Sequence, residues 1–218
     1  MKTVLFDLDG TLIDTEKYFR IAWPRTLAEF GYHMTDEQAL TLRSLGRPFA
    51  PVKLKEMFGP EADYYRLRER RKQIMEELIA ERGLFLKPGA EELVGWLKRN
   101  DFGAAIVTAT DPERTARYLD RTALPVSRFD RVISATMVER GKPAPDVYLY
   151  ACEALGTRPA DCFAVEDAPN GILSAAAAGC RVIMVPDQTQ PDEALSRLLW
   201  ACVPSLDRVI PLLEKETE

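Results

Sequence analysis

Short hydrophobic runs alternate along the chain with longer amphipathic stretches. The hydrophobic runs have the length of β-strands and lie at 3–8, 103–108, 131–134, 162–166 and 181–185. Stretches with helical spacing of apolar residues separate them at 89–100, 112–121, 145–155 and 169–178. Nearly continuous apolar strands that alternate with helices are typical of a parallel sheet covered on both faces. The pattern therefore predicts an α/β fold with a doubly wound parallel sheet.

Residues 15–83 interrupt this alternation. They contain several helical patterns, including a charged one at 61–83, but no second strand. The simplest interpretation is an all-helical domain inserted after the first strand. The chain is then expected to form an α/β core from residues 1–14 and 84–218 and a helical cap from residues 15–83. Pro24 lies within the first of these helices and is expected to kink or break it.

Composition and charge exclude several classes of function. The 218-residue chain has a net charge of −5 and a pI near 5.2, which argues against general binding to nucleic acid or to an anionic membrane. Its apolar runs fall short of the roughly 18 residues that a membrane span requires. The four cysteines are widely spaced and have no CxxC pairing, so they are expected to be reduced core residues. With no N-terminal signal sequence recognised, a cytoplasmic protein is expected.

Two carboxylates follow the first apolar run, in the stretch LFDLDGT. Asp7 and Asp9 are separated by one leucine, and Gly10 permits a sharp turn directly after them. At the carboxyl end of a parallel strand, such a pair can bind a divalent cation, supply a nucleophile or shuttle a proton. It can also be a helix cap or a solvated turn. The pair alone leaves these interpretations open.

Three further segments favour chemistry over a structural role. Thr108 ends the second apolar run, where its hydroxyl and the following amides can hold an anion. Lys142 precedes two prolines in GKPAP, and Glu166 and Asp167 end another apolar run. A second acidic pair, a hydroxyl and a lysine at neighbouring strand ends form a consistent set for Mg²⁺-assisted phosphoryl transfer.

These motifs, in this order, resemble the four motifs of the haloacid dehalogenase superfamily: DLDGT, the threonine that ends GAAIVT, GKPAPDVY and the ED of VEDAPNGI. The helical insert is similar to the cap of the group that includes β-phosphoglucomutase, phosphoglycolate phosphatase and small sugar-phosphate phosphatases. The resemblance implies a Rossmann-like core and a Mg²⁺-dependent phosphatase that hydrolyses a small phosphorylated metabolite, most simply a sugar or polyol phosphate.

The resemblance also implies roles for individual residues. Asp7 matches the nucleophile that forms an aspartyl-phosphate, and Asp9 matches the acid/base that protonates the leaving oxygen and then activates water. The phosphoryl group is expected on Thr108, Ala109 and Lys142. The residues that the resemblance implies for Mg²⁺ are Asp7, Asp9 (through its backbone carbonyl), Asp167 and Glu166, the last directly or through water.

Residues of the insert are expected to recognise the leaving group of the substrate. Arg47 and Lys53, in GRPFAPVK, are the candidates, although Arg47 is equally compatible with a solvated loop. Asp14 is expected to have a structural role at the start of the cap.

Single residues distinguish between several alternative activities. True dehalogenases and the phosphonate-cleaving branch lack the carboxylate that Asp9 supplies, so Asp9 argues against both. The segment DTxxYxxxAW is similar to β-phosphoglucomutase, but Phe19 occupies the place of that enzyme's cap histidine, and the single histidine, His33, lies elsewhere. Hydrolysis is therefore favoured, with a phosphosugar mutase as the alternative and a catalytically silent binding protein as a third hypothesis. A monomer or weak homodimer with a small-molecule phosphoester as its partner is expected.

Overall fold

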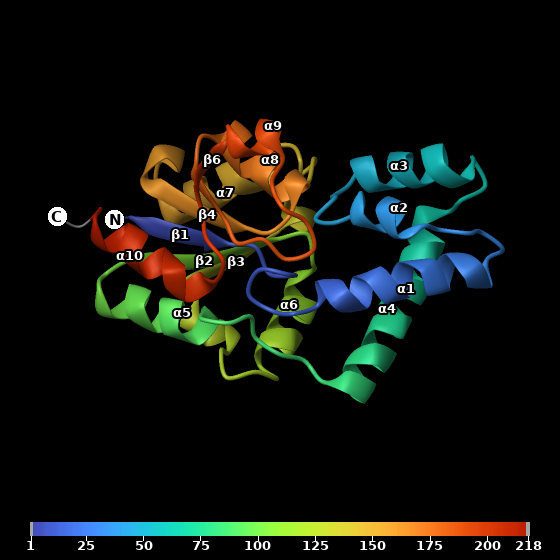
Figure 1. Ribbon diagram of the computed structural model, residues 1–218, viewed down its shortest axis with the longest axis horizontal. Coiled ribbons are helices and arrows are strands. Elements are labelled where there is room, and N and C mark those ends of the chain that lie inside the picture. Colours follow the sequence, from blue (N-terminus) through green and yellow to red (C-terminus); the bar gives the residue numbers. More distant parts are fainter. Residues whose placement is uncertain (1, 217–218) are drawn as a thin grey trace.

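A six-stranded parallel sheet forms the centre of the protein (Figure 1). The computed structural model describes residues 2–216. The strands are β1 (Thr3–Phe6), β2 (Gly103–Thr108), β3 (Arg131–Ser134), β4 (Cys162–Glu166), β5 (Arg181–Met184) and β6 (Leu199–Cys202), in the order β3-β2-β1-β4-β5-β6. In the register of the sheet, Leu5 pairs with Ala105 on one side and with Ala164 on the other. The strand order reverses direction between β1 and β4, and the crevice at such a point is where doubly wound sheets bind ligands.

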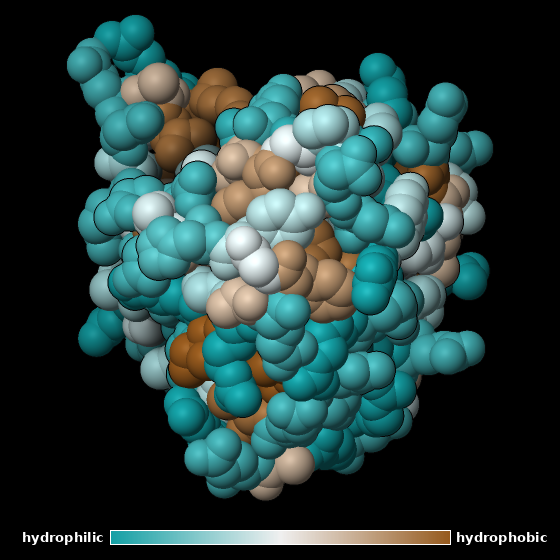
Figure 2. Space-filling model, turned by 90° about the vertical axis from the view of Figure 1, so that its right-hand side faces the viewer, coloured by the Kyte–Doolittle hydropathy of each residue, from teal (hydrophilic) through white to brown (hydrophobic). Residues whose placement is uncertain are grey.

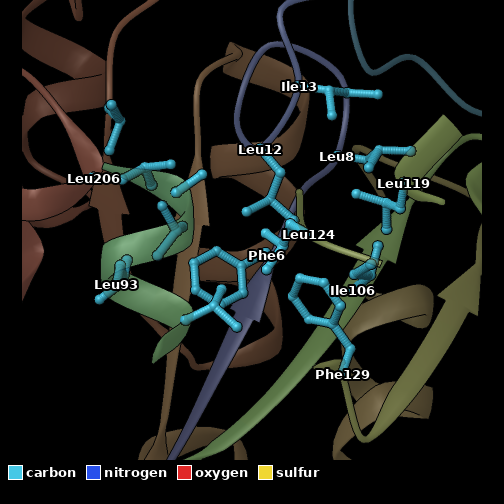
Figure 3. Close-up of a cluster of buried hydrophobic side chains, with 14 of the residues drawn as sticks. Phe6, Leu8, Leu12, Ile13, Leu93, Ile106, Leu119, Leu124, Phe129 and Leu206 are labelled. Carbon is cyan, nitrogen blue, oxygen red and sulfur yellow. The ribbon is translucent and has the colours of Figure 1, made fainter. Parts of the chain in front are cut away.

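Helices cover both faces of the sheet, as predicted. They are α5 (Ala90–Arg99), α6 (Pro112–Leu119), α7 (Asp146–Leu155), α8 (Pro169–Ala178), α9 (Glu193–Ser196) and α10 (Ile210–Glu214), with short 3-10 turns at Val126–Arg128, Ala135–Met137, Pro159–Asp161 and Leu206–Val209. Because successive side chains of a strand point to opposite faces, Val4 and Phe6 join the cluster under α5, α6 and α10, whereas Leu5 joins the cluster under α7 and α8. Figure 3 shows the first of these clusters around Phe6.

The predicted strands agree with the structure except at three places. The fifth strand ends at Met184 rather than at residue 185. The first strand ends at Phe6 rather than at residue 8, although the Asp7 amide still donates to the Val165 carbonyl at 3.0 Å. The sixth strand, β6, was not predicted, because at the edge of the sheet its residues are only alternately half-buried. The expectation of four core cysteines was wrong for Cys202, which is exposed on this edge strand, whereas Cys152, Cys162 and Cys180 are buried free thiols.

The insert between β1 and the rest of the sheet is helical. It contains α1 (Glu16–Glu29), α2 (Asp36–Leu40), α3 (Phe49–Phe58) and α4 (Tyr64–Arg82), which stand beyond the carboxyl end of β1 (Figure 1). Helix α1 runs through Pro24 without a break. Thr35 and Asp63 cap the starts of α2 and α4 by accepting backbone amides. The distal parts of these helices pack around a hydrophobic cluster of their own that includes Trp23, Leu27 and Leu54.

Two neighbouring chain segments connect the insert to the core. The amide of Asp14 donates to the Phe85 carbonyl at 2.9 Å, and the amide of Lys87 donates to the Leu12 carbonyl at 2.9 Å. The end of the molecule formed by the insert is largely hydrophilic, with apolar side chains showing between the polar ones (Figure 2). Among the described residues, the helices are too short or too polar to cross a membrane.

Candidate active site

The predicted functional residues meet at one edge of the sheet. Asp7 directly follows β1, Thr108 is the last residue of β2, and Glu166 is the last residue of β4. Lys142 comes from the loop between β3 and α7. Because all the strands are parallel, their carboxyl ends lie together, and residues separated by more than 100 positions come into contact there.

Lys142 joins two of the acidic residues. Its Nζ lies 2.6 Å from Asp7 Oδ1, 2.6 Å from Glu166 Oε1 and 2.9 Å from the Val107 carbonyl, and the side chain is fully buried. Burial by itself would lower the pKa of this ammonium group, but the charges of Asp7 and Glu166 raise it above its usual value. Lys142 is therefore charged and offsets the repulsion between the two carboxylates.

Three carboxylates form a cluster with the donor set of a divalent-cation site. Oxygens of Asp7, Glu166 and Asp167 lie within 4.8 Å of one another. Within residues 2–216, Asp7 Oδ2 and Glu166 Oε2 are buried without a hydrogen-bond partner. Burial raises the pKa of Glu166 to about 8 and that of Asp167 to about 7, although Lys142 and Arg43, respectively, oppose these shifts. An oxygen-only set with unsatisfied oxygens fits a hard cation such as Mg²⁺, which would stabilise the ionised forms.

Asp9 lies beside this cluster but is held separately. Its Oδ1 accepts from the Thr15 hydroxyl at 2.6 Å, and its Oδ2 accepts from the Thr110 hydroxyl at 2.7 Å. The intervening Leu8 is buried in the hydrophobic cluster (Figure 3). The carboxylate of Asp9 is thus held by two hydroxyls and is not part of the group of three clustered acids, so a contact with a metal is expected from its backbone carbonyl. The hydroxyls of Thr15 and Thr110 were not predicted to hold Asp9.

The insert contributes an arginine that the sequence did not single out. Arg43 is buried and donates to the carboxylate of Asp167, to Glu16 Oε2 at 3.2 Å and to Thr189 Oγ1 at 3.1 Å. The candidate from sequence, Arg47, is exposed and does not line the cavity described below. The only signal for Arg43 was a single charge within the apolar segment LTLRSLG, which does not distinguish a buried arginine from a solvated one.

A cavity between the insert and the core opens onto these groups. The core side is formed by Asp7, Asp9, Thr108 and Ala109, and the insert contributes the aromatic rings of Phe19, Trp23 and Tyr64. Five arginines also line it: Arg20, Arg43, Arg68, Arg71 and Arg114. The cavity thus combines a carboxylate-rich end with a strongly basic wall.

Two glycines allow the carboxylates to approach the backbone. Gly10 has a φ of +84°, and a Cβ there would lie 2.4 Å from Asp167 Oδ2. A Cβ on Gly171, in the first turn of α8, would lie 2.0 Å from Glu166 Oε2. Any larger residue at either position would displace one of the clustered acids.

Comparison with known proteins identifies the family. The sequence model of haloacid dehalogenase-like hydrolases matches residues 1–179. The chain belongs to this family. Among its relatives, Protein CbbY of Rhodobacter capsulatus is 34% identical over 208 residues and 92% of each chain, and Hexitol phosphatase A of Escherichia coli is 35% identical over 84% of this chain and 82% of its own. A crystal structure of β-phosphoglucomutase from Clostridium difficile shares the fold, with a TM-score of 0.83 over 99% of this chain and 96% of its own at 20% identity. The crystal structure and this chain therefore have the same α/β fold.

Proposed function

We propose that this haloacid dehalogenase-like hydrolase is a Mg²⁺-dependent phosphatase that hydrolyses a small phosphorylated metabolite, with a sugar or polyol phosphate as the substrate class. The observation that carries the proposal is the environment of the two carboxylate oxygens of Asp7. One carboxylate oxygen is held by Lys142 at 2.6 Å, while the other is buried, has no partner among residues 2–216 and belongs to the three-acid cluster. A carboxylate fixed in this way is prepared to meet phosphorus or a metal ion.

In the first half of the reaction, a carboxylate oxygen of Asp7 attacks phosphorus. The bond between phosphorus and the leaving oxygen breaks, and Asp9 donates a proton to that oxygen. Thr108, the amide of Ala109 and Lys142 bind the phosphoryl oxygens. A Mg²⁺ ion held by Asp7, Glu166 and Asp167 would neutralise charge on the phosphoryl group. The products of this half are an alcohol and an aspartyl-phosphate on Asp7.

In the second half, Asp9 accepts a proton from a water molecule that attacks the aspartyl-phosphate. The bond between phosphorus and the Asp7 oxygen breaks, which releases inorganic phosphate and restores the carboxylate. The hydrogen bonds from Thr15 and Thr110 keep the Asp9 carboxylate in one orientation for both proton transfers.

Phe19 supports hydrolysis over mutase chemistry. It lines the cavity at the position where the resemblance to β-phosphoglucomutase would place a histidine, and it packs against the guanidinium of Arg71 rather than offering a proton-transfer group. The name of the relative Hexitol phosphatase A points to the same reaction class.

The test replaces Asp7 with Asn and assays phosphate release from a panel of phosphorylated metabolites with Mg²⁺. The wild-type protein should hydrolyse at least one compound, and Asp7→Asn should lower kcat by about 1,000-fold or more because the amide is not a nucleophile. Asp14→Asn in the same segment is the matched control, since the Asp14 side chain pairs with Lys17 at the surface. Turnover by Asp7→Asn at the wild-type rate would refute the assignment of Asp7 as the nucleophile. Phosphorus NMR of a hexose 1-phosphate would reveal a mutase as an isomerised phosphoester instead of free phosphate.

A further inference from the structure

Arg71 is a buried cation that has no ion-pair partner among residues 2–216. It lies on α4, lines the cavity and is 6% exposed. Within residues 2–216 it makes no ion pair or hydrogen bond, and its Nε is among the buried atoms without a partner. Its guanidinium lies over the ring of Phe19 at 4.7 Å and over that of Trp23 at 5.1 Å. The aromatic rings fix the position of the guanidinium but do not neutralise it.

A second arginine faces the same space from the core. Arg114, on α6, is 5% exposed and lines the same cavity, and its Nε also lacks a partner among the described residues. Its Nη2 is 3.6 Å from Asp111 Oδ2 and 3.5 Å from Thr110 Oγ1. Asp111 is half-exposed and also accepts the Arg114 amide as the cap of α6, so it satisfies Arg114 only in part.

The two guanidinium groups repel each other. Burial and then the charge of Arg114 lower the pKa of Arg71 to about 10, and the opposing effects of Tyr64 and Asp9 are too small to offset them. A buried charge that is not neutralised costs folding free energy, so a cavity that holds an unpaired Arg71 and a partly paired Arg114 suggests a compensating role for the two arginines. A bound anion would provide that compensation, because guanidinium forks match the oxygens of carboxylates and phosphates.

We propose that Arg71 and Arg114 form a binding site for a second anionic group of the substrate, a carboxylate or a second phosphate, at the end opposite the transferred phosphoryl group. The inference rests on the phosphatase function proposed above. The expected position of the second anionic group follows from Thr110, whose hydroxyl donates to Asp9 and lies 3.5 Å from Arg114 Nη2. Asp9 protonates the leaving oxygen, so the remainder of the substrate extends from Asp9 toward the two arginines.

The test compares three compounds with the same six-carbon chain: sorbitol 6-phosphate, 6-phosphogluconate and sorbitol 1,6-bisphosphate. They differ at carbon 1, which carries a hydroxyl, a carboxylate or a phosphate. Dissociation constants are measured by calorimetry with Mg²⁺ on the Asp7→Asn protein, and kcat/KM is measured on the wild type. At least one of the two doubly anionic compounds should bind about 10-fold or more tightly than sorbitol 6-phosphate, and the stronger of them identifies the second group.

Arg71→Met should abolish this preference and weaken the binding of the doubly anionic compounds far more than that of sorbitol 6-phosphate, whereas Arg71→Lys should retain part of the preference. Arg70→Met is the matched control on the same helix, because Arg70 is paired with Glu29 and Glu77 outside the cavity. Equal affinity for the three compounds would overturn the proposal. So would an equal loss for all three in Arg71→Met, because the arginine would then serve the transferred phosphoryl group.

The two proposals fail in different ways. A wild-type protein that hydrolyses sorbitol 6-phosphate but shows no preference for a second anion refutes only the anion site. A clear preference in binding with no release of phosphate counts against the phosphatase and leaves the anion site standing.

The stability of Arg71→Met provides a further measurement. Without ligand, this variant should unfold in urea at the same midpoint as wild type or at a higher one, because it removes an unneutralised charge. A lower midpoint with an unchanged binding preference would make Arg71 a packing residue.

Discussion

At the scale of single residues, Lys142 has the greatest influence on the site. It is the direct partner of both Asp7 and Glu166, and all three side chains are buried. A single cation in this position reduces the repulsion between the two acids and opposes the rise that burial causes in the pKa of each. The Tyr148 hydroxyl also donates to Glu166, so the carboxylate is held from two sides.

Replacing Lys142 with Met should therefore destabilise the protein as well as abolish activity. The substitution removes the cation that stabilises these two buried carboxyl groups, and the free energy of unfolding should fall by about 3–5 kcal/mol near neutral pH. Urea unfolding of both proteins measures the difference. Lys72→Met, which removes a surface pair with Glu69, should change the same quantity by less than about 1 kcal/mol. A Lys142→Met protein as stable as wild type would show that Asp7 and Glu166 do not need the ammonium group.

At the scale of elements, the site depends on the short connection between the end of β4 and the start of α8. Glu166 ends β4, and α8 begins at Pro169, so only two residues separate the strand from the helix. Gly171 lies in the first turn of α8 and leaves room for the Glu166 carboxylate against the helix backbone. The short connection thus places an acid at the start of a helix, where the helix dipole favours negative charge.

This arrangement predicts opposite effects for one substitution in two helices. Glycine in a helix interior is usually less favourable than alanine by about 1 kcal/mol. Gly95→Ala in α5 should therefore stabilise the protein by up to that amount, since the nearest atom is the flexible end of Arg99 at 3.3 Å. Gly171→Ala should instead destabilise it by roughly 1–3 kcal/mol, because the new Cβ collides with Glu166. Denaturant unfolding of the two variants provides the comparison, and a stabilised Gly171→Ala protein would contradict the contact.

At the scale of the whole molecule, the insert and the core meet directly at the loop that carries Lys142. The Gly46 amide donates to the Lys142 carbonyl at 2.8 Å, and the Gly141 amide donates to the Arg47 carbonyl at 2.7 Å. Asn170 donates from its side chain to the Arg43 carbonyl at 2.8 Å. These bonds hold the insert against the core next to the acidic cluster, and the cavity between the two parts reaches Asp7 and Asp9.

The charge of this enclosed cluster predicts a dependence of stability on pH. Burial raises the pKa of Asp167 to about 7 and that of Glu166 to about 8, above the ordinary values of 3.8 and 4.5. At pH values between the ordinary pKa values and the raised ones, the folded protein binds more protons than the unfolded chain. The stability from these two groups is therefore complete at low pH and is lost as the pH rises through the folded pKa values. With a chelator present, Tm should fall between about pH 5 and pH 8.

Magnesium should reverse this trend. It binds the ionised carboxylates, so it should raise Tm more at pH 8 than at pH 5. Calorimetric scans with EDTA or with saturating Mg²⁺ at the two pH values measure both effects. The Glu166→Gln/Asp167→Asn double variant is the control, and it should lose most of the pH dependence and of the response to Mg²⁺. An equal Mg²⁺ effect at both pH values would place the ion elsewhere.

The sequence identified the elements whose signal is local and strong. Five apolar strands and the helices between them were confirmed, because residues buried on both faces of a sheet form continuous apolar runs. The edge strand β6 was missed because its side chains are only partly buried, and Cys202 was wrongly expected in the core for the same reason. The contact of Lys142 with Asp7 and Glu166 agrees with the predicted grouping of strand-end residues, while their catalytic roles stay predictions.

By itself, then, the sequence determined the α/β fold, the family and the acids and lysine that follow the strands. These depend on short motifs whose backbone geometry is set by neighbouring residues. Only the tertiary structure decided which arginines line the cavity with buried side chains: Arg43, Arg71 and Arg114 rather than Arg47. Arginine side chains are long, and a helix surface offers several of them. Their burial depends on how the insert packs against the core, which the local sequence pattern does not specify.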